Sequence, residues 1–169
     1  MKNEQIRSEG EQIIEEYFQE EDIKFKPEVK IENLKGDNKP YRKADFYLPQ
    51  YKTYVEFFGL WNLDRNKEKY REKKRIYENN KIPCVYIYPD NLGILNFIFK
   101  RRLKNVLKKY NMRLELLKIN WSILREKHLP PIIIFLLLVI FIENIVAKII
   151  FGLFFIYFVY LGFKLTFFK

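Results

Sequence analysis

Apolar and polar positions follow a helical pattern and then an alternating pattern along the first part of the chain. Ser8 is followed three residues later by Glu11, which is the sequence of a helix capping box, and apolar residues then recur at helical spacing to about Asp22. From residue 23 to 31, apolar residues alternate with charged ones, and Pro27 marks this segment as an edge strand or a bulge. The pattern predicts a helix followed by a strand.

Two segments rich in aromatic and β-branched residues, Tyr41–Leu48 and Thr53–Phe58, come next. Because the four residues between them have turn character, they predict a β-hairpin. A symmetric loop in this hairpin places Phe46 opposite Val55.

The same register places Asp45 directly opposite Glu56 on one face of the hairpin. Two carboxylates in this position are destabilising unless they share a proton or a cation, so the pair suggests a divalent metal site. The alternative is a half-exposed hairpin whose polar face carries two acids without a further function.

A charged helix is predicted from Asp64, its N-cap, to about Asn80. Tyr70 and Tyr77 lie on one narrow face with Lys73 or Lys74 between them, at spacings of three and four residues. A short apolar run over 83–88 then predicts a buried strand. The order of elements becomes helix, three strands, helix and strand, which is an α/β fold.

Two amphipathic helices are expected after this strand. The first is capped by Asp90 or Asn91 and carries an apolar stripe opposite basic residues as far as Tyr110. The second covers residues 113–128, and its Trp121 suits a membrane interface.

Residues 132–168 are almost wholly apolar and have the composition of a membrane segment. Their length predicts a hairpin of two short transmembrane helices that turns between Glu143 and Lys148. The alternative is one span over 149–168 preceded by a re-entrant or interfacial piece. Basic residues before the first span place the preceding domain in the cytoplasm, and a hairpin returns Lys169 to the same side.

Charge and composition limit which partners, metal ligands and catalytic groups the protein can have. A net charge of +10 indicates a polyanionic partner, either nucleic acid or an anionic membrane surface. The single cysteine, Cys84, excludes an internal disulfide and lies in an apolar run typical of a small buried side chain. The single histidine, His128, argues against histidine-rich metal sites and against Ser-His or Cys-His catalysis. Carboxylates must therefore bind any metal.

Asp45, the glutamate of Val55-Glu56-Phe57-Phe58-Gly59 and the order of elements together resemble the PD-(D/E)XK nuclease superfamily. Phe58 stands where that family usually has a lysine. The segment DFYLP…YVEFFG with the Tyr/Lys-rich helix after it is similar to the branch of very-short-patch-repair and Holliday-junction-resolvase-like nucleases, in which the lysine is displaced. The resemblance implies a restriction-endonuclease-like αβββαβ core.

By this resemblance, Asp45 and Glu56 hold Mg²⁺ or Mn²⁺, and Glu11 on the first helix assists them. A capping role accounts for Glu11 equally well, and Glu15 is the substitute. Lys73 is the expected catalytic lysine. Lys74 is the second candidate, and Lys43 is the third because the hairpin register sets it beside Phe58.

The sequence thus predicts a nuclease-like domain over 1–110, an amphipathic linker helix over 111–129 and a membrane hairpin over 130–169. The expected protein is a membrane-anchored, Mg²⁺-dependent DNA endonuclease facing the cytoplasm. Its expected partners are DNA and the lipid bilayer, with a homodimer as a candidate assembly. Two other classes stay open: an inactive nuclease fold that only binds nucleic acid, and a membrane-anchored interaction protein.

Overall fold

The computed structural model describes residues 8–127, 129–140 and 145–167. The chain divides into two compact units, one up to Leu116 and the other from Leu117 onward, and each is described by itself.

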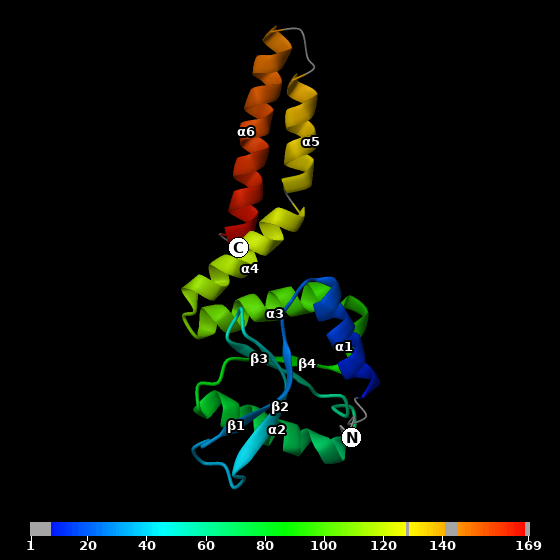
Figure 1. Ribbon diagram of the computed structural model, residues 1–169, viewed down its shortest axis with the longest axis vertical. Helices are drawn as coiled ribbons and strands as arrows, with labels where there is room; N and C mark the ends of the chain where they lie inside the picture. The colour runs from blue at the N-terminus through cyan, green and yellow to red at the C-terminus, as the bar shows by residue number, and fades with distance from the viewer. Residues whose placement is uncertain (1–7, 128, 141–144, 168–169) are drawn as a thin grey trace. The chain divides into compact units, whose positions relative to one another are not determined.

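The first unit is a mixed α/β domain built on a four-stranded sheet, as predicted. Strands β1 to β3 are antiparallel neighbours, and β4 lies parallel to β3 at the other edge. Figure 1 shows α1 and α3 on one side of the sheet and α2 on the other. The elements follow in the order α1 (Glu9–Glu20), β1 (Lys26–Glu32), β2 (Tyr41–Leu48), β3 (Thr53–Phe57), α2 (Asp64–Asn79), β4 (Cys84–Ile87), a 3-10 helix (Pro89–Ile94), α3 (Leu95–Lys109) and the start of α4 (Arg113–Lys127).

Aromatic rings form the core between the sheet and the layer of α1 and α3. The ring of Phe18 in α1 lies 5.5 Å from that of Phe46 in β2 and 5.2 Å from that of Phe99 in α3, measured between centroids. All three side chains are buried. A second cluster joins the sheet to α2 through Ile76 and Tyr77, and it includes the buried thiol of Cys84.

Strand β2 contacts both helical layers. Ala44 belongs to the cluster formed with Ile76 and Tyr77 of α2, whereas Phe46 packs on the other layer. Asp45 lies between these two residues, so it stands where the strand passes from one layer to the other. The β1–β2 ladder pairs Pro27 with Phe46 and Val29 with Ala44. Between them, Glu28 has a φ of 53°, a left-handed conformation that non-glycine residues adopt only at an energetic cost.

Several element boundaries differ from the sequence prediction. The first strand begins at Lys26 rather than Ile23, because the amide of Ile23 still donates to the carbonyl of Phe18 and closes the end of α1. It does form a sheet edge and does contain Pro27, as predicted. The N-cap of α2 is Leu63, so the prediction of Asp64 as the cap was wrong by one residue.

The predicted cap of the next helix was also wrong. Residues Pro89–Ile94 form a 3-10 helix, in which the side chain of Asn91 accepts a hydrogen bond from the amide of Tyr88. That bond closes the turn locally, and the α-helix begins only at Leu95. Ile94, the last residue of the 3-10 helix, is exposed.

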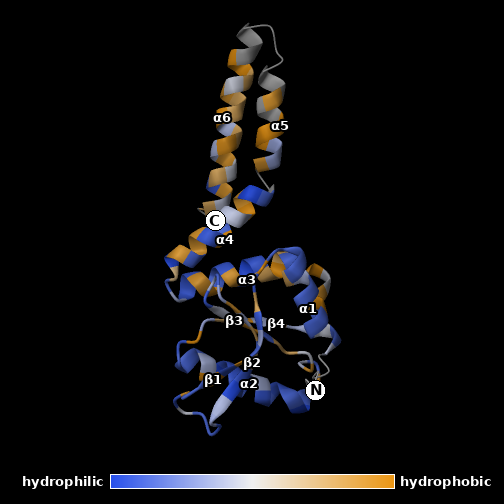
Figure 2. Ribbon diagram, viewed as in Figure 1, coloured by the Kyte–Doolittle hydropathy of each residue, from blue (hydrophilic) through white to orange (hydrophobic). Residues whose placement is uncertain are grey.

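The second unit is helical and mostly apolar. Its helices α5 (Leu129–Ile140) and α6 (Ile145–Phe167) lie against each other. Figure 2 shows hydrophobic residues dominating both, in contrast to the largely hydrophilic α2. Within the described residues, one helix is long and apolar enough to cross a membrane, over Ile149–Phe167.

The predicted two-span hairpin stays a prediction. The described part of α5 has 12 residues and covers roughly 18 Å at 1.5 Å per residue, less than the hydrocarbon core of about 30 Å. The 23 residues of α6 cover about 34 Å, which is enough. Of the predicted turn, residues 145–148 are helical and begin α6, so the turn does not extend to Lys148. Glu143 and Asn144 lie outside the described residues, as does His128.

Candidate functional site

The site begins where the ladder between β2 and β3 ends. Leu48 pairs with Thr53 and Phe46 pairs with Val55, which confirms the predicted hairpin register. Continuing this register by one residue places Asp45 opposite Glu56. Among the described residues, the β2–β3 ladder stops at Phe46 and Val55, and Glu56 pairs with Tyr86 of β4 instead.

Side chains make hydrogen bonds where the backbone ladder stops. The amide of Phe57 in β3 donates to Oδ2 of Asp45 at 2.7 Å. The ammonium group of Lys73 in α2 donates to the carbonyl oxygen of Lys43 in β2 at 2.9 Å. Side chains of the site thus form hydrogen bonds with backbone groups of both strands. The geometry of the site therefore depends on the geometry of the sheet.

Glu56 is the most enclosed member of the site, with only 1% of its surface exposed. Its Oε2 lies 2.5 Å from Nζ of Lys73, and its Oε1 accepts a hydrogen bond of 2.9 Å from the hydroxyl of Tyr77. Burial raises the pKa of Glu56 to about 8, an effect that the neighbouring Lys73 opposes and the charge of Asp45 strengthens. Glu56 therefore holds a proton more tightly than an exposed glutamate does.

Asp45 is partly buried, and burial raises the pKa of its carboxyl group. The ammonium group of Lys73 and the hydrogen bond from Phe57 act in the opposite direction, while the charge of Glu11 adds to the rise. A divalent cation would favour the ionised forms of Asp45 and Glu56 together, because it offsets both the burial and their mutual repulsion.

The structure separates the three candidate lysines. Lys73 alone contacts Glu56, with an 18% exposed side chain. Lys74 extends elsewhere, with its Nζ 5.4 Å from the ring centroid of Tyr86. Lys43 forms an ion pair of 2.8 Å with Glu28 on β1.

Phe58 occupies an aromatic cluster and leaves no room for a lysine at its position. It is 1% exposed, and its ring stacks on that of Tyr70 with centroids 4.3 Å apart. Tyr70, Lys73 and Tyr77 therefore all lie on the face of α2 that the spacing indicated, with the lysine between two aromatic anchors.

Glu11 lies at the rim of the site. It forms the predicted capping box with Ser8, through two hydrogen bonds of 3.4 Å. The neighbouring Gly10 allows α1 to approach β3 closely, since a Cβ atom there would meet the ring of Phe57 at 2.2 Å. Glu15, the substitute, lies one turn further along α1.

A groove of about 590 Å³ opens beside Glu11 and Phe57, and neither Asp45 nor Glu56 lines it. It is bounded by the start of α1, the end of β3, Tyr70 of α2 and the 3-10 helix. Glu11 lines it, so the groove offers room for a substrate within reach of the acidic rim.

The donor set suits a small hard cation. Mg²⁺ binds oxygen ligands and commonly takes only one or two carboxylates together with water and substrate phosphate. Asp45 and Glu56 supply two such carboxylates. No cluster of three or more His, Cys, Asp or Glu side chains with metal-binding geometry occurs in the described parts of the chain.

A buried arginine holds α2 in place beside the site. Arg42 of β2 is 5% exposed, contacts Asp37 through two hydrogen bonds of 2.6 and 2.8 Å, and reaches Glu72 of α2 at 2.9 Å. Because Glu72 precedes Lys73, this contact fixes the part of the helix that carries the lysine. The sequence pattern gave no signal for this role.

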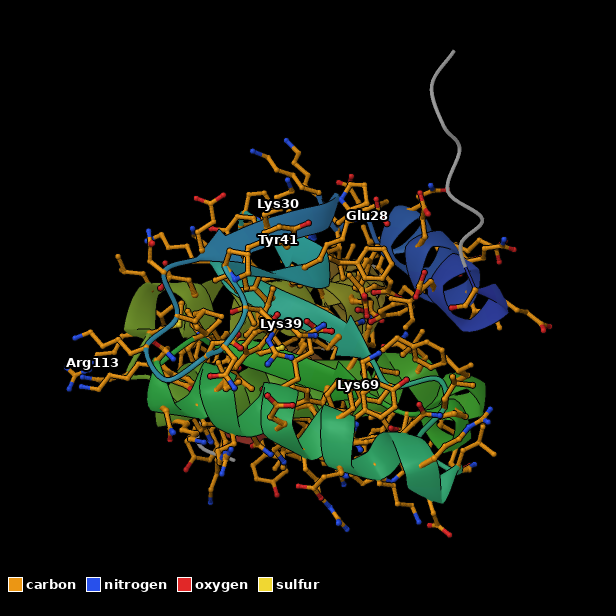
Figure 3. All side chains as sticks on the ribbon, turned by 90° about the horizontal axis from the view of Figure 1, so that it is seen from below. Glu28, Lys30, Lys39, Tyr41, Lys69 and Arg113 are labelled. Atoms are coloured by element: carbon orange, nitrogen blue, oxygen red, sulfur yellow. The ribbon has the colours of Figure 1, made fainter. Side chains whose placement is uncertain are left out.

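Exposed lysines from three segments are visible in one view of the domain. Figure 3 shows Lys30 on β1, Lys39 on the following loop and Lys69 on α2, with Tyr41 between Lys30 and Lys39. The Nζ of Lys30 lies 4.6 Å from the ring centroid of Tyr41. This surface offers positive charge to a polyanion.

Comparisons of the chain with models of protein families, with curated proteins and with solved structures gave no match.

Proposed function

We propose that this protein is a membrane-anchored, metal-dependent DNA endonuclease. The observation that carries the proposal is the meeting of Asp45, Glu56 and Lys73, which come from β2, β3 and α2. Two carboxylates and one lysine in contact are the groups that the resemblance to PD-(D/E)XK nucleases requires.

In this proposal, Asp45 and Glu56 would hold Mg²⁺ or Mn²⁺, with Glu11 assisting from the rim. The metal supplies a Lewis acid for the phosphate and lowers the pKa of a bound water. Tyr77 and the amide of Phe57 keep the two carboxylates oriented.

Lys73 acts on the reacting groups. Its ammonium group, held between Glu56 and the carbonyl of Lys43, is placed to orient the attacking water and to stabilise negative charge that develops on the phosphate. Lys74 and Lys43 extend to other partners, which makes Lys73 the preferred candidate.

DNA is the proposed substrate. The net charge of +10 and the exposed lysines of the domain favour a polyanion, and phosphate contacts of this kind position a duplex without reading its sequence. The apolar helix α6 would anchor the enzyme in the bilayer, with the catalytic domain on the cytoplasmic side by the distribution of basic residues.

The test is cleavage by the full chain in an uncharged detergent. Supercoiled, linear, branched and single-stranded DNA are incubated with Mg²⁺, with Mn²⁺ and with a chelator. We expect metal-dependent cleavage that Asp45→Asn and Glu56→Gln each abolish while metal-free DNA binding is retained. Wild-type cleavage by either variant would overturn the assignment of the site.

A catalytically inactive DNA-binding module is the second candidate. The ion pair of 2.5 Å between Lys73 and Glu56 supports it, because a lysine in contact with a buried carboxylate compensates its charge without a metal. Salt-dependent DNA binding without cleavage under all metal conditions would favour this class. Absence of DNA binding would favour a membrane-anchored interaction protein instead.

A further inference from the structure

A cationic pocket, separate from the groove beside Glu11, lies at the edge of the sheet formed by β4. It has a volume of about 330 Å³ and no acidic residue in its lining. The residues around it that bear on its chemistry are Lys74, Tyr86, Tyr88, Arg102 and Asn105.

Arg102 is a partly buried cation without an acidic partner among the described residues. Its Nη1 donates to the carbonyl oxygen of Tyr86 and, at 2.8 Å, to Oδ1 of Asn91, and its guanidinium lies 5.2 Å from the ring centroid of Tyr88. Burial lowers the pKa of Arg102, because the charge has lost water and no carboxylate compensates it. Such a group is stabilised when an anion binds beside it.

Lys74 adds a second positive charge to the same pocket. It follows Lys73 in α2, yet the two side chains have different partners: Lys73 contacts Glu56, whereas Lys74 lies over the ring of Tyr86. Lys74 makes no ion pair within the described chain. Two cations that lack acidic partners and line one cavity are complementary to a doubly charged anion.

Tyrosines give the pocket an aromatic wall. The hydroxyl of Tyr86 is buried and lacks a nitrogen or oxygen partner among the described residues. The ring of Tyr88 contacts both Arg102 and Trp61, with its centroid 5.0 Å from that of Trp61. Aromatic rings beside cations are a common environment for nucleobases, which stack on them.

We propose that this pocket binds the phosphate group of a nucleotide, with Lys74 and Arg102 holding the phosphate and Tyr88 contacting the base. The volume lies at the lower end of the range for small-molecule sites, about 300 to 1,000 Å³, and suits a mononucleotide unit. Neither Lys74 nor Arg102 is part of the carboxylate site at Asp45 and Glu56. Binding of a nucleotide in this pocket therefore does not depend on DNA cleavage at that site.

The test is calorimetric titration of the full chain in uncharged detergent with a chelator present. Inorganic phosphate, a nucleoside monophosphate and the matching nucleoside are compared. We expect the monophosphate to bind most tightly, and Lys74→Gln to weaken it by about tenfold or more, as for the loss of one charge-assisted hydrogen bond. Lys24→Gln, which removes the same charge from an exposed residue away from the pocket, should leave the affinity unchanged.

Arg102→Gln should also weaken binding of the nucleoside monophosphate. Arg102→Lys tests whether a positive charge at this position is enough for that binding. Because Arg102 also contacts the backbone of β4, Lys74→Gln is the decisive variant. The proposal is overturned if Lys74→Gln binds the monophosphate like the wild type, or if the nucleoside binds equally well.

Two further experiments are needed. The first asks whether the bound phosphate comes from a DNA strand end or from a free nucleotide, and the second separates this proposal from the nuclease proposal. Competition by an oligonucleotide with a 5′-phosphate, but not by the same strand without it, assigns the pocket to a strand end. Absence of competition by both assigns it to a free nucleotide. Asp45→Asn should bind the monophosphate normally, so the pocket stands or falls independently of the carboxylate site.

Discussion

The hydroxyl of Tyr77 donates a hydrogen bond of 2.9 Å to Oε1 of Glu56, and both side chains are buried. This contact leaves Oε2 of Glu56 for Lys73. Tyr77 thereby restrains the rotamer of the carboxylate from the far side of the site, and in the proposed nuclease it would be a positioning residue rather than a catalytic one.

Replacement of Tyr77 by Phe should lower the free energy of unfolding by about 1–3 kcal/mol, because it leaves Oε1 of a buried carboxylate without a donor. The measurement is thermal or urea denaturation of the full chain in detergent, followed by near-UV circular dichroism. Tyr41→Phe is the matched control, because its ring is 43% exposed and should tolerate the loss of a hydroxyl. Equal stability of the two variants would show that the bond to Glu56 contributes nothing.

The stability of the fold should fall as pH rises from about 5 to about 8 when no metal is present. The pKa of Glu56 lies above its ordinary value of 4.5, at about 8, so the folded state holds the proton more tightly than the unfolded state throughout this window. The slope expected from one group is at most about 1.4 kcal/mol per pH unit. Denaturation at a series of pH values measures it.

Glu56→Gln is the control for that slope, since glutamine is neutral at every pH. Most of the dependence should disappear in this variant, and the raised pKa of Asp45 leaves a weaker slope of the same sign. An unchanged slope would assign the effect to other groups.

Gly10→Ala should destabilise the protein although alanine favours helices by about 1 kcal/mol. A Cβ atom at this position would lie 2.2 Å from the ring of Phe57, so either this ring or α1 must shift. The expected net loss is about 1–3 kcal/mol, the usual cost of overpacking. Gly93→Ala, where nothing lies within 4 Å of the added atom, should have little effect.

Lys73→Ala should lower the single-turnover rate of DNA cleavage by about 100-fold or more while changing DNA affinity little, because in the proposed mechanism the lysine acts on charge that develops in the transition state. Lys74→Ala and Lys43→Ala should keep most of the rate, since neither side chain contacts Glu56. Rates measured with saturating enzyme separate the chemical step from binding. A strong rate loss in Lys43→Ala alone would contradict this assignment.

A tag placed after Lys169 should be accessible from the same side of the membrane as the N-terminal domain. This follows from the proposed hairpin, in which the apolar helices α5 and α6 both enter the bilayer. Protease protection of sealed vesicles measures the side on which each end lies. Digestion of the two ends from opposite sides would favour the single span over Ile149–Phe167.

The sequence predicted the hairpin register well, and the reason is geometric. Strand periodicity and a four-residue loop leave few registers that bury both Phe46 and Val55, and the observed pairing is the symmetric one. The start of α3 was missed because a side chain, Asn91, closed a local turn that the apolar pattern does not reveal.

The helix pattern alone does not decide which of the two adjacent lysines in α2 contacts Glu56. Adjacent residues on a helix point about 100° apart, so choosing between Lys73 and Lys74 requires the rotation of α2 against the sheet. That rotation depends on tertiary contacts such as Arg42 with Glu72. Tyr77 was visible in the spacing of aromatic residues, but its bond to Glu56 was not.

The hydrogen bond from Phe57 to Asp45 has a consequence for spectroscopy. An amide proton that points at a carboxylate oxygen 2.7 Å from its nitrogen changes its NMR chemical shift when that carboxylate gains or loses a proton. The Phe57 amide therefore reports the charge state of Asp45 from within the backbone. A titration that follows this one resonance would show protonation and metal binding at the carboxylates directly, without a substrate.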